Sequence, residues 1–104
     1  MNIKQKIDAS SLIELVKVSD ISDIWIVHGK TSDEKHYYDI KYILNGYSGT
    51  SCEASARFWD ERSKPQKVLL KILKAIRNSK QSESEYLVVF TNDILLSSEI
   101  DLDD

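Results

Sequence analysis

The sequence predicts an α+β domain in which two helices pack on a mostly antiparallel sheet, with elements in the order α-β-β-β-α-β. Two segments repeat apolar residues at helical spacing, and four short segments alternate apolar with polar residues or are rich in β-branched and aromatic ones. The chain of 104 residues has the length of a single domain, residues 1–104. Its composition, 41% apolar and 30% charged, is typical of a globular chain with enough apolar surface for a core.

The first predicted element is a short helix near residues 10–18. Ser11 and Glu14 have the Ser-x-x-Glu spacing of a capping box, in which both side chains accept hydrogen bonds from the first turn of a helix. The apolar residues that then recur at helical spacing are Leu12, Leu15 and Val16.

Two strands and a turn are predicted next. Residues 24–27 are β-branched and aromatic, which favours a strand that ends near Gly29, and the polar residues 30–35 then form a loop. Residues 38–44 alternate apolar with polar side chains, as in a strand with one buried face. Asn45-Gly46 follows, and both residues tolerate the positive φ of a hairpin turn.

Residues 50–60 fit two structures. Thr50 and Glu53 have the spacing of a capping box, which would begin a helix. The alternation of small or apolar residues with polar ones covers more of the segment and favours a third strand. The residues on the apolar side of that strand are Cys52, Ala54, Ala56 and Phe58.

The second predicted helix begins at Ser63 and ends near Asn78 or Ser79. Ser63 and Gln66 form a second capping box, and Pro65 suits a first turn. At about 100° per residue one broad face is apolar, and a narrow arc nearly opposite is basic. The apolar face consists of Val68, Leu69, Ile72, Leu73 and Ile76, and the basic arc of Lys64, Lys67, Lys71 and Lys74.

The end of the chain combines short β elements with negative charge. Residues 86–90 form a largely apolar strand, Asn92-Asp93 is a turn, and residues 94–96 form a short strand or helical turn. Residues 57–80 carry eight basic and two acidic groups, whereas residues 81–104 carry seven acidic and no basic groups. This segregation indicates electrostatic docking, either to a partner or within the chain. The acidic C-terminal end, residues 97–104, is the part expected to fray.

The sequence contains few residues that could carry chemistry. His28 and His36 lack the i, i+4 spacing with which two imidazoles on a helix share a zinc ion, and we interpret both as structural residues at loop edges. A single Cys52 on an apolar face is typical of a small buried thiol. There is no phosphate-binding loop and no dinucleotide fingerprint. We therefore expect no catalytic residue, metal or cofactor.

The location predicted from the sequence is cytoplasmic. The first eight residues lack the apolar run of a signal peptide, and no stretch approaches the roughly 20 apolar residues of a membrane span. A lone cysteine also implies no oxidising compartment. No membrane contact is expected, and the oligomeric state is left open.

The predicted element order resembles the core of restriction-endonuclease-like nucleases. That resemblance implies an acid on one strand and an acid-x-Lys motif on the next, with carboxylates that hold Mg²⁺. Asp39 and Glu53 have a plausible spacing, and Glu14 would match an accessory acid on the first helix. Ser55 stands where the motif needs Lys, so the sequence predicts at most a degenerate or divergent Mg-dependent nuclease.

Residues 10–79 also resemble a double-stranded RNA-binding domain, which has the order α-β-β-β-α. The resemblance implies RNA contacts from Glu14, from His36 in a loop, and from Lys64 and Lys67 at the start of the second helix. Lys71 and Lys74 continue the same basic arc along the phosphate backbone. The Gly-rich turn of that family is absent before Ser63, and the net charge of −3 is unusual for a nucleic-acid binder.

The function that the sequence favours is that of a small protein-binding protein without catalysis. In size, acidity and lack of catalytic motifs the chain resembles the immunity proteins that neutralise bacterial nuclease toxins, which implies a basic protein partner. Trp59, flanked by charged residues, is a candidate surface anchor. The other candidate partner-binding residues are the acids Glu99, Asp101, Asp103 and Asp104. In the alternative interpretation, the lysine arc is a solvated face balanced by the chain's own acidic end.

Overall fold

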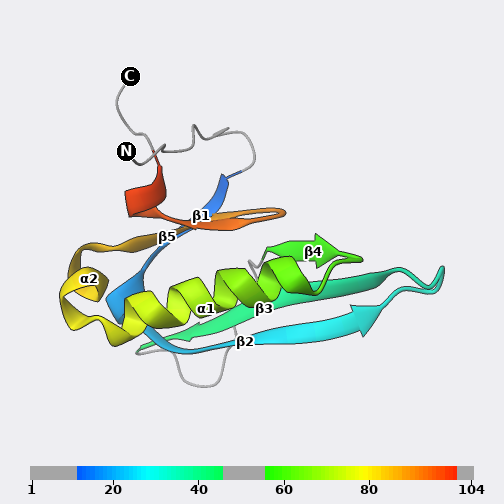
Figure 1. Cartoon of the computed structure of the whole chain (residues 1–104), viewed down its shortest axis with the longest axis horizontal. Coiled ribbons are helices and arrows are strands. Elements are labelled where there is room, and N and C mark those ends of the chain that lie inside the picture. Colours follow the sequence, from blue (N-terminus) through cyan, green and yellow to red (C-terminus); the bar gives the residue numbers. More distant parts are fainter. Residues whose placement is uncertain (1–11, 46–55, 101–104) are drawn as a thin grey trace.

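The computed structural model of the protein describes residues 12–45 and 56–100. These residues form two α-helices and two antiparallel three-stranded sheets, which confirms the predicted α+β class (Figure 1). The predicted order and packing are only partly right, because the described chain begins with a strand where a helix was predicted, and its strands form two sheets where a single sheet was predicted. No helix in these two ranges is long and apolar enough to cross a membrane.

The first sheet has the strand order β2-β3-β4 and contains the long hairpin of the molecule. β2 (Ile21–Lys30) and β3 (His36–Leu44) confirm two predicted strands and extend both beyond the predicted bounds. The loop between them is closed by Glu34, at φ 68°, whose N–H donates to the Thr31 carbonyl over 3.0 Å. β4 (Arg57–Trp59) pairs with the start of β3.

The predicted third strand is confirmed over its last residues only. β4 provides the buried Phe58, and Ala56 just before it is also buried, in agreement with the predicted alternation. Gly46 of the predicted hairpin turn, the earlier part of this strand and Cys52 fall on residues 46–55 and lie outside the described residues, whereas Asn45 is described as a turn residue at the end of β3.

The second sheet has the order β1-β5-β6, and its first strand corrects the sequence analysis. β1 (Leu12–Lys17) pairs antiparallel with β5 (Tyr86–Phe90), so the helix predicted near residues 10–18 is wrong. Within β1, Val16 is 3% exposed and its neighbour Leu15 59% exposed, which is the alternation of a strand. Pairing with a strand some seventy residues away therefore prevails over the local capping signal.

The end of the described chain is packed rather than frayed. β5 and β6 (Ile94–Leu96) confirm the predicted strands, and the 3-10 turn η3 (Ser97–Glu99) follows directly. Ile100 is 2% exposed and packs against Val88 and Phe90 of β5. The expected fraying is therefore wrong for residues 97–100, and residues 101–104 lie outside the described residues.

The helix α1 (Ser63–Arg77) confirms the predicted second helix, but not its cap. Its N-cap is Arg62, which makes no side-chain capping bond, and the Ser63 hydroxyl donates instead to Glu61 over 3.1 Å. A second short helix, α2 (Ser79–Ser84), was not predicted. It begins where the Asn78 side chain accepts the Gln81 N–H over 3.2 Å.

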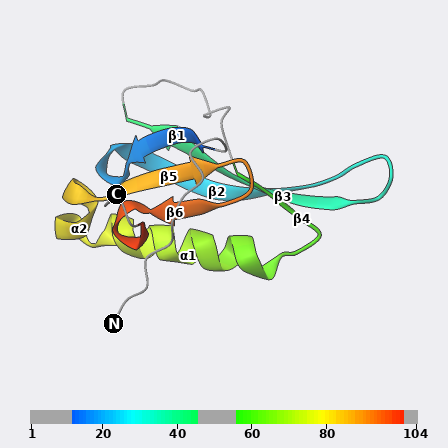
Figure 2. The ribbon, with the colours of Figure 1, turned by 90° about the horizontal axis from the view of Figure 1, so that it is seen from above.

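α1 lies across one face of the β2–β3 hairpin, and β5 and β6 lie beside it (Figures 1 and 2). The short 3-10 turn η2 (Val18–Asp20) carries the chain from β1 of one sheet into β2 of the other. One continuous core therefore joins both sheets and the helix. Its fully buried large side chains include Ile40, Tyr42, Ile72, Leu87, Val89 and Ile94.

Candidate interaction surfaces

The first candidate site lies on the outer face of the β2-β3-β4 sheet. Tyr37 pairs with Trp59 across β3 and β4, so both side chains leave the same face of the sheet. Their neighbours Tyr38 and Phe58 point to the opposite face, which α1 covers. We call Tyr37, Arg57 and Trp59 together the aromatic platform.

Two aromatic rings and one guanidinium group form the aromatic platform. The Arg57 guanidinium carbon lies 4.0 Å from the centre of the Tyr37 ring and 5.5 Å from that of Trp59. The two rings meet edge to face, with centroids 6.0 Å apart and an angle of 64° between their planes. Trp59 is 47% exposed, so half of the largest side chain type faces solvent on this surface.

Asp39 holds Arg57 in this position. Its two carboxylate oxygens accept hydrogen bonds from Arg57 Nε and Nη2, each over 2.8 Å, while Asp39 itself is 3% exposed. The hydrogen bonds that Arg57 donates to Asp39 raise the pKa of Arg57 above its ordinary value, against the effect of burial. The two-pronged contact fixes the plane of the guanidinium group beside both rings.

Gly29 provides the space in which the Tyr37 ring lies. Gly29 is the cross-strand partner of Tyr37, and a Cβ atom at Gly29 would stand 2.1 Å from Tyr37 Cζ. No side chain fits at that distance, so only glycine lets the ring lie against the backbone of β2. The ring then shields a strand position that has no side chain of its own.

The backbone after Trp59 is also held. The Asp60 N–H donates to the His36 carbonyl over 2.8 Å, and the His36 N–H donates to Asp60 Oδ1 over 3.0 Å. Asp60 has a φ of 53°, in the left-handed region that aspartate tolerates better than most residues. These bonds tie the end of β4 to the start of β3 and fix the direction in which Trp59 projects.

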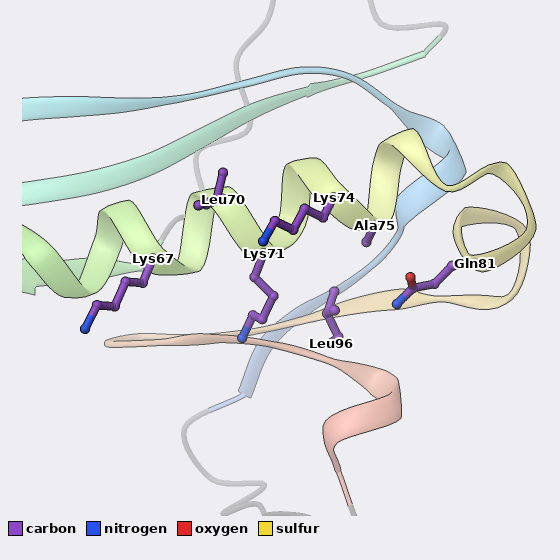
Figure 3. Close-up of a pocket in the computed structure, with 7 residues that line it drawn as sticks. All are labelled: Lys67, Leu70, Lys71, Lys74, Ala75, Gln81 and Leu96. Carbon is purple, nitrogen blue, oxygen red and sulfur yellow. The ribbon is translucent and has the colours of Figure 1, made fainter.

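The second candidate site is the lysine side of α1. A cavity of about 360 Å³ lies between α1, α2 and β6, and Figure 3 shows three lysines around it, with Leu96 and Ala75 beside them. The residues that line it are Lys67, Leu70, Lys71, Lys74, Ala75, Gln81 and Leu96. An anionic group with an apolar part would suit such a lining.

The four lysines of the basic arc are not equivalent. Lys71 Nζ donates to Glu99 Oε2 over 2.9 Å and to the Ile94 carbonyl over 3.4 Å, and is partly buried. Lys64 Nζ lies 3.8 Å from Asp93 Oδ2. Lys67 and Lys74 are exposed, and neither forms a salt bridge within the described residues. Asp93 and Glu99 thus neutralise half of the arc from within the chain.

The acids predicted to bind a partner are placed in different surroundings. Glu99 Oε2 accepts both the Lys71 ammonium and the Leu96 N–H, the latter over 2.8 Å, so that oxygen is occupied. β4, which carries Trp59, and η3, which carries Glu99, are well separated along the long axis of the molecule (Figures 1 and 2). Asp101, Asp103 and Asp104 lie outside the described residues.

Glu85, an acid that the sequence analysis did not single out, is buried beside α2. Its Oε1 accepts the Ser97 hydroxyl over 2.6 Å and the Ser98 N–H over 2.7 Å, and its Oε2 accepts the Gln81 amide over 3.2 Å. Burial alone would raise the pKa of Glu85, but these hydrogen bonds outweigh it and the pKa is lowered. Glu85 therefore ties η3 to the end of α2.

The positions that the two resemblances assigned to nucleic-acid chemistry are arranged differently from those families. Glu14 lies in β1, not on a helix, and accepts a hydrogen bond from the Tyr42 hydroxyl. His36 begins β3 rather than lying in a loop, and Asp39 is engaged by Arg57. Glu53 lies outside the described residues. Within residues 12–45 and 56–100, no three His, Cys, Asp or Glu side chains gather as metal ligands would.

The sequence analysis identified Trp59 but missed its partners. Tyr37 and Arg57 carry no local signal, because their proximity depends on the register between β3 and β4. The one available clue was strand periodicity. Residues 37 and 39 share one face of their strand, and residues 57 and 59 share one face of theirs. Among known proteins, no family model, no curated sequence and no solved structure matches the chain.

Proposed function

We propose that this protein is a small, non-catalytic binding protein whose protein partner docks on the aromatic platform. The observation that carries the proposal is an exposed Trp59 held beside Arg57 and Tyr37 on one sheet face. Tryptophan, tyrosine and arginine are the residues most enriched among the hot spots of protein interfaces. A lone exposed aromatic residue is ordinary on a protein surface, whereas three of these residue types in contact are not.

The rigidity of the aromatic platform supports the same proposal. Immobilising a long side chain at an interface costs about 0.5–1.5 kcal/mol, and Arg57 is already immobilised by Asp39 before any partner arrives. Its charge is also offset by Asp39, so a partner can cover the guanidinium face without leaving an unpaired cation. A surface of this kind binds through shape and apolar contact.

The kind of partner is the second part of the proposal. The net charge of −3 and the excess of acids after residue 80 favour a basic protein, such as a nuclease toxin that an immunity-type inhibitor neutralises. Glu85 and Glu99 are engaged within the chain, so we assign the long-range attraction to Asp101, Asp103 and Asp104. The proposal includes a cytoplasmic location, since a single cysteine requires no oxidising compartment.

The test is a tagged pull-down from the native host, with and without nuclease treatment, using the wild type, Trp59→Ala and Leu70→Ala. Leu70 is the matched control, because it is 54% exposed and lies on α1, away from the aromatic platform. A partner protein should be recovered in near-equal amount to the tagged chain and should stay bound after nuclease treatment. Trp59→Ala should weaken the binding of that partner about 30-fold, equivalent to about 2 kcal/mol. Equal affinity of the wild type and Trp59→Ala would reject the aromatic platform as the interface.

A second candidate function, binding of a nucleic-acid backbone, rests on the exposed Lys67 and Lys74 beside the cavity. Removing both should lower the salt slope of duplex RNA binding by about two units. Removing Lys64 and Lys71 should change that slope less, because internal acids already neutralise them. Absence of RNA binding by the wild type at low salt would exclude this function.

A further inference from the structure

We propose that His28 and His36 form a chelating site for a divalent transition metal, with Cu²⁺ and Ni²⁺ the best-fitting ions. The two imidazoles come from opposite strands of the β2–β3 hairpin, where His28 pairs with Tyr38 and His36 pairs with Lys30. They therefore occupy diagonal positions on one face of the sheet, next to the loop that joins β2 to β3. His28 Nε2 lies 2.9 Å from His36 Nδ1.

The separation of the two nitrogens matches the ligand spacing of a square-planar or octahedral metal. Two metal–nitrogen bonds of about 2.0 Å at a right angle place the two nitrogens about 2.8 Å apart, whereas a tetrahedral zinc places them about 3.3 Å apart. A proton now joins these nitrogens in a hydrogen bond. The ring centroids lie 5.1 Å apart, so the two nitrogens now point almost directly at each other. A metal ion about 2.0 Å from both nitrogens would lie off the line between them, so each ring must turn by about 45° to aim its lone pair at the ion.

The His28 ring and the His36 backbone are both held before any metal binds. The His28 ring stacks on Tyr38, with centroids 4.6 Å apart and planes 15° from parallel. The backbone of His36 exchanges two hydrogen bonds with Asp60, so the root of that side chain is fixed as well. A chelate whose ligands are pre-positioned loses little conformational entropy on binding.

The surroundings leave room for the rest of the coordination sphere. His28 borders a cavity of about 220 Å³, and His36 is the first residue of β3, directly after the hairpin loop. Two cations beside the site have contacts of their own. Lys30, which pairs with His36 across the hairpin, has its Nζ 3.6 Å from Glu34 Oε1, and Arg62, which lines the same cavity as His28, has its guanidinium carbon 5.9 Å from the centre of the Tyr38 ring. Two protein ligands leave the other positions open to water, as in an exchangeable site and unlike a closed structural one.

The test measures binding of Ni²⁺ and Cu²⁺ to the full chain by titration calorimetry at neutral pH. All variants carry Cys52→Ser, because a thiolate elsewhere in the chain would also bind these ions. One equivalent should bind, Cu²⁺ more tightly than Ni²⁺. Acidification should weaken binding, because protons compete for the imidazole nitrogens.

His28→Gln and His36→Gln should each weaken binding at least tenfold, whereas Glu34→Gln, which changes a nearby acid, should not. The ring proton signals of Tyr38 should also broaden with Cu²⁺, since that ring touches His28. Failure of the Cys52→Ser protein to bind either ion would overturn the proposal. So would binding that persists unchanged in either histidine variant while circular dichroism shows that variant to be folded.

Discussion

Arg57 and Lys71 each form an ion pair with an acid from a distant part of the sequence, yet the surfaces around them differ. Arg57 donates to both oxygens of a buried Asp39, and its guanidinium carbon lies 4.0 Å from the centre of the Tyr37 ring and 5.5 Å from that of Trp59. Lys71 meets Glu99 through a single contact, and two further lysines beside it stay exposed. The first pair creates a rigid, nearly neutral aromatic surface. The second partly neutralises a basic surface on which Lys67 and Lys74 stay exposed to solvent.

The difference teaches that net charge alone does not identify the interaction surface of this chain. Its two most conspicuous charge features are the basic helix and the excess of acids after residue 80. Ion pairs between them partly neutralise both. The aromatic platform carries little net charge and was represented in the sequence by Trp59 alone. Four substitutions test the contacts around these two surfaces, and they follow in order of decreasing expected effect.

Asp39→Ala should have the largest effect, because it removes both hydrogen bonds from Arg57 and opens space under the aromatic platform. Breaking a buried ion pair from one side costs 3–5 kcal/mol, and the half-exposed Arg57 puts this case at about 3 kcal/mol of unfolding free energy. Urea unfolding measures the loss, with the exposed Asp20→Ala as the control. A change below 1 kcal/mol would show that the pair does not organise the aromatic platform.

Glu85→Gln should cost about 2 kcal/mol at neutral pH, because charged acceptors give the stronger hydrogen bonds to Ser97 and Ser98. The folded pKa of Glu85 is lowered, so its contribution is present above the unfolded pKa and lost as pH falls through the folded pKa. Urea unfolding from pH 7 to pH 3 should therefore show that the unfolding free energy of Glu85→Gln falls less with acidification than that of the wild type. An identical pH slope in both proteins would contradict this role.

Gly29→Ala should cost about 1 kcal/mol and act on the aromatic platform alone. The new methyl group would meet the Tyr37 ring, which must swing away from Gly29 and from Arg57. Partner binding and Trp59 fluorescence should both change, while the lysine side of α1 stays as it is. In a protein that already carries Tyr37→Ala, the Gly29→Ala change should cost no further stability, because the ring that the methyl group would meet is gone. If the two changes are additive, the ring does not occupy this space.

Lys71→Met should have the smallest effect, below about 1 kcal/mol, because Lys71 and Glu99 form a partly exposed pair. The loss should shrink further at 1 M salt, where exposed charges are screened. Thermal unfolding at low and high salt measures both values. Lys67→Met, at an exposed position on the same helix, is the matched control and should leave the melting temperature unchanged.

Local sequence signals located most elements of the structure. The apolar face of residues 63–77 and the β-branched or alternating residues of β2, β3 and β5 indicate their own secondary structure, because period and propensity act within a few residues. The same signals failed at residues 12–17, where a capping pattern and helical spacing coincide with a strand. Propensity differences of a few tenths of a kcal/mol are smaller than the free energy of pairing with β5 and burying Val16.

By itself, the sequence determined the α+β class, the long helix, the central strands and the segregation of charge, since each is encoded by neighbouring residues. Only the tertiary structure decided which distant residues meet. The register of β3 with β4 places Arg57 and Trp59 beside Tyr37, and the register of β2 with β3 brings His28 to His36. The packing of η3 against α1 sets Glu99 on Lys71. A shift of one residue in either register would send these side chains to the opposite face, so strand pairing determines the candidate sites.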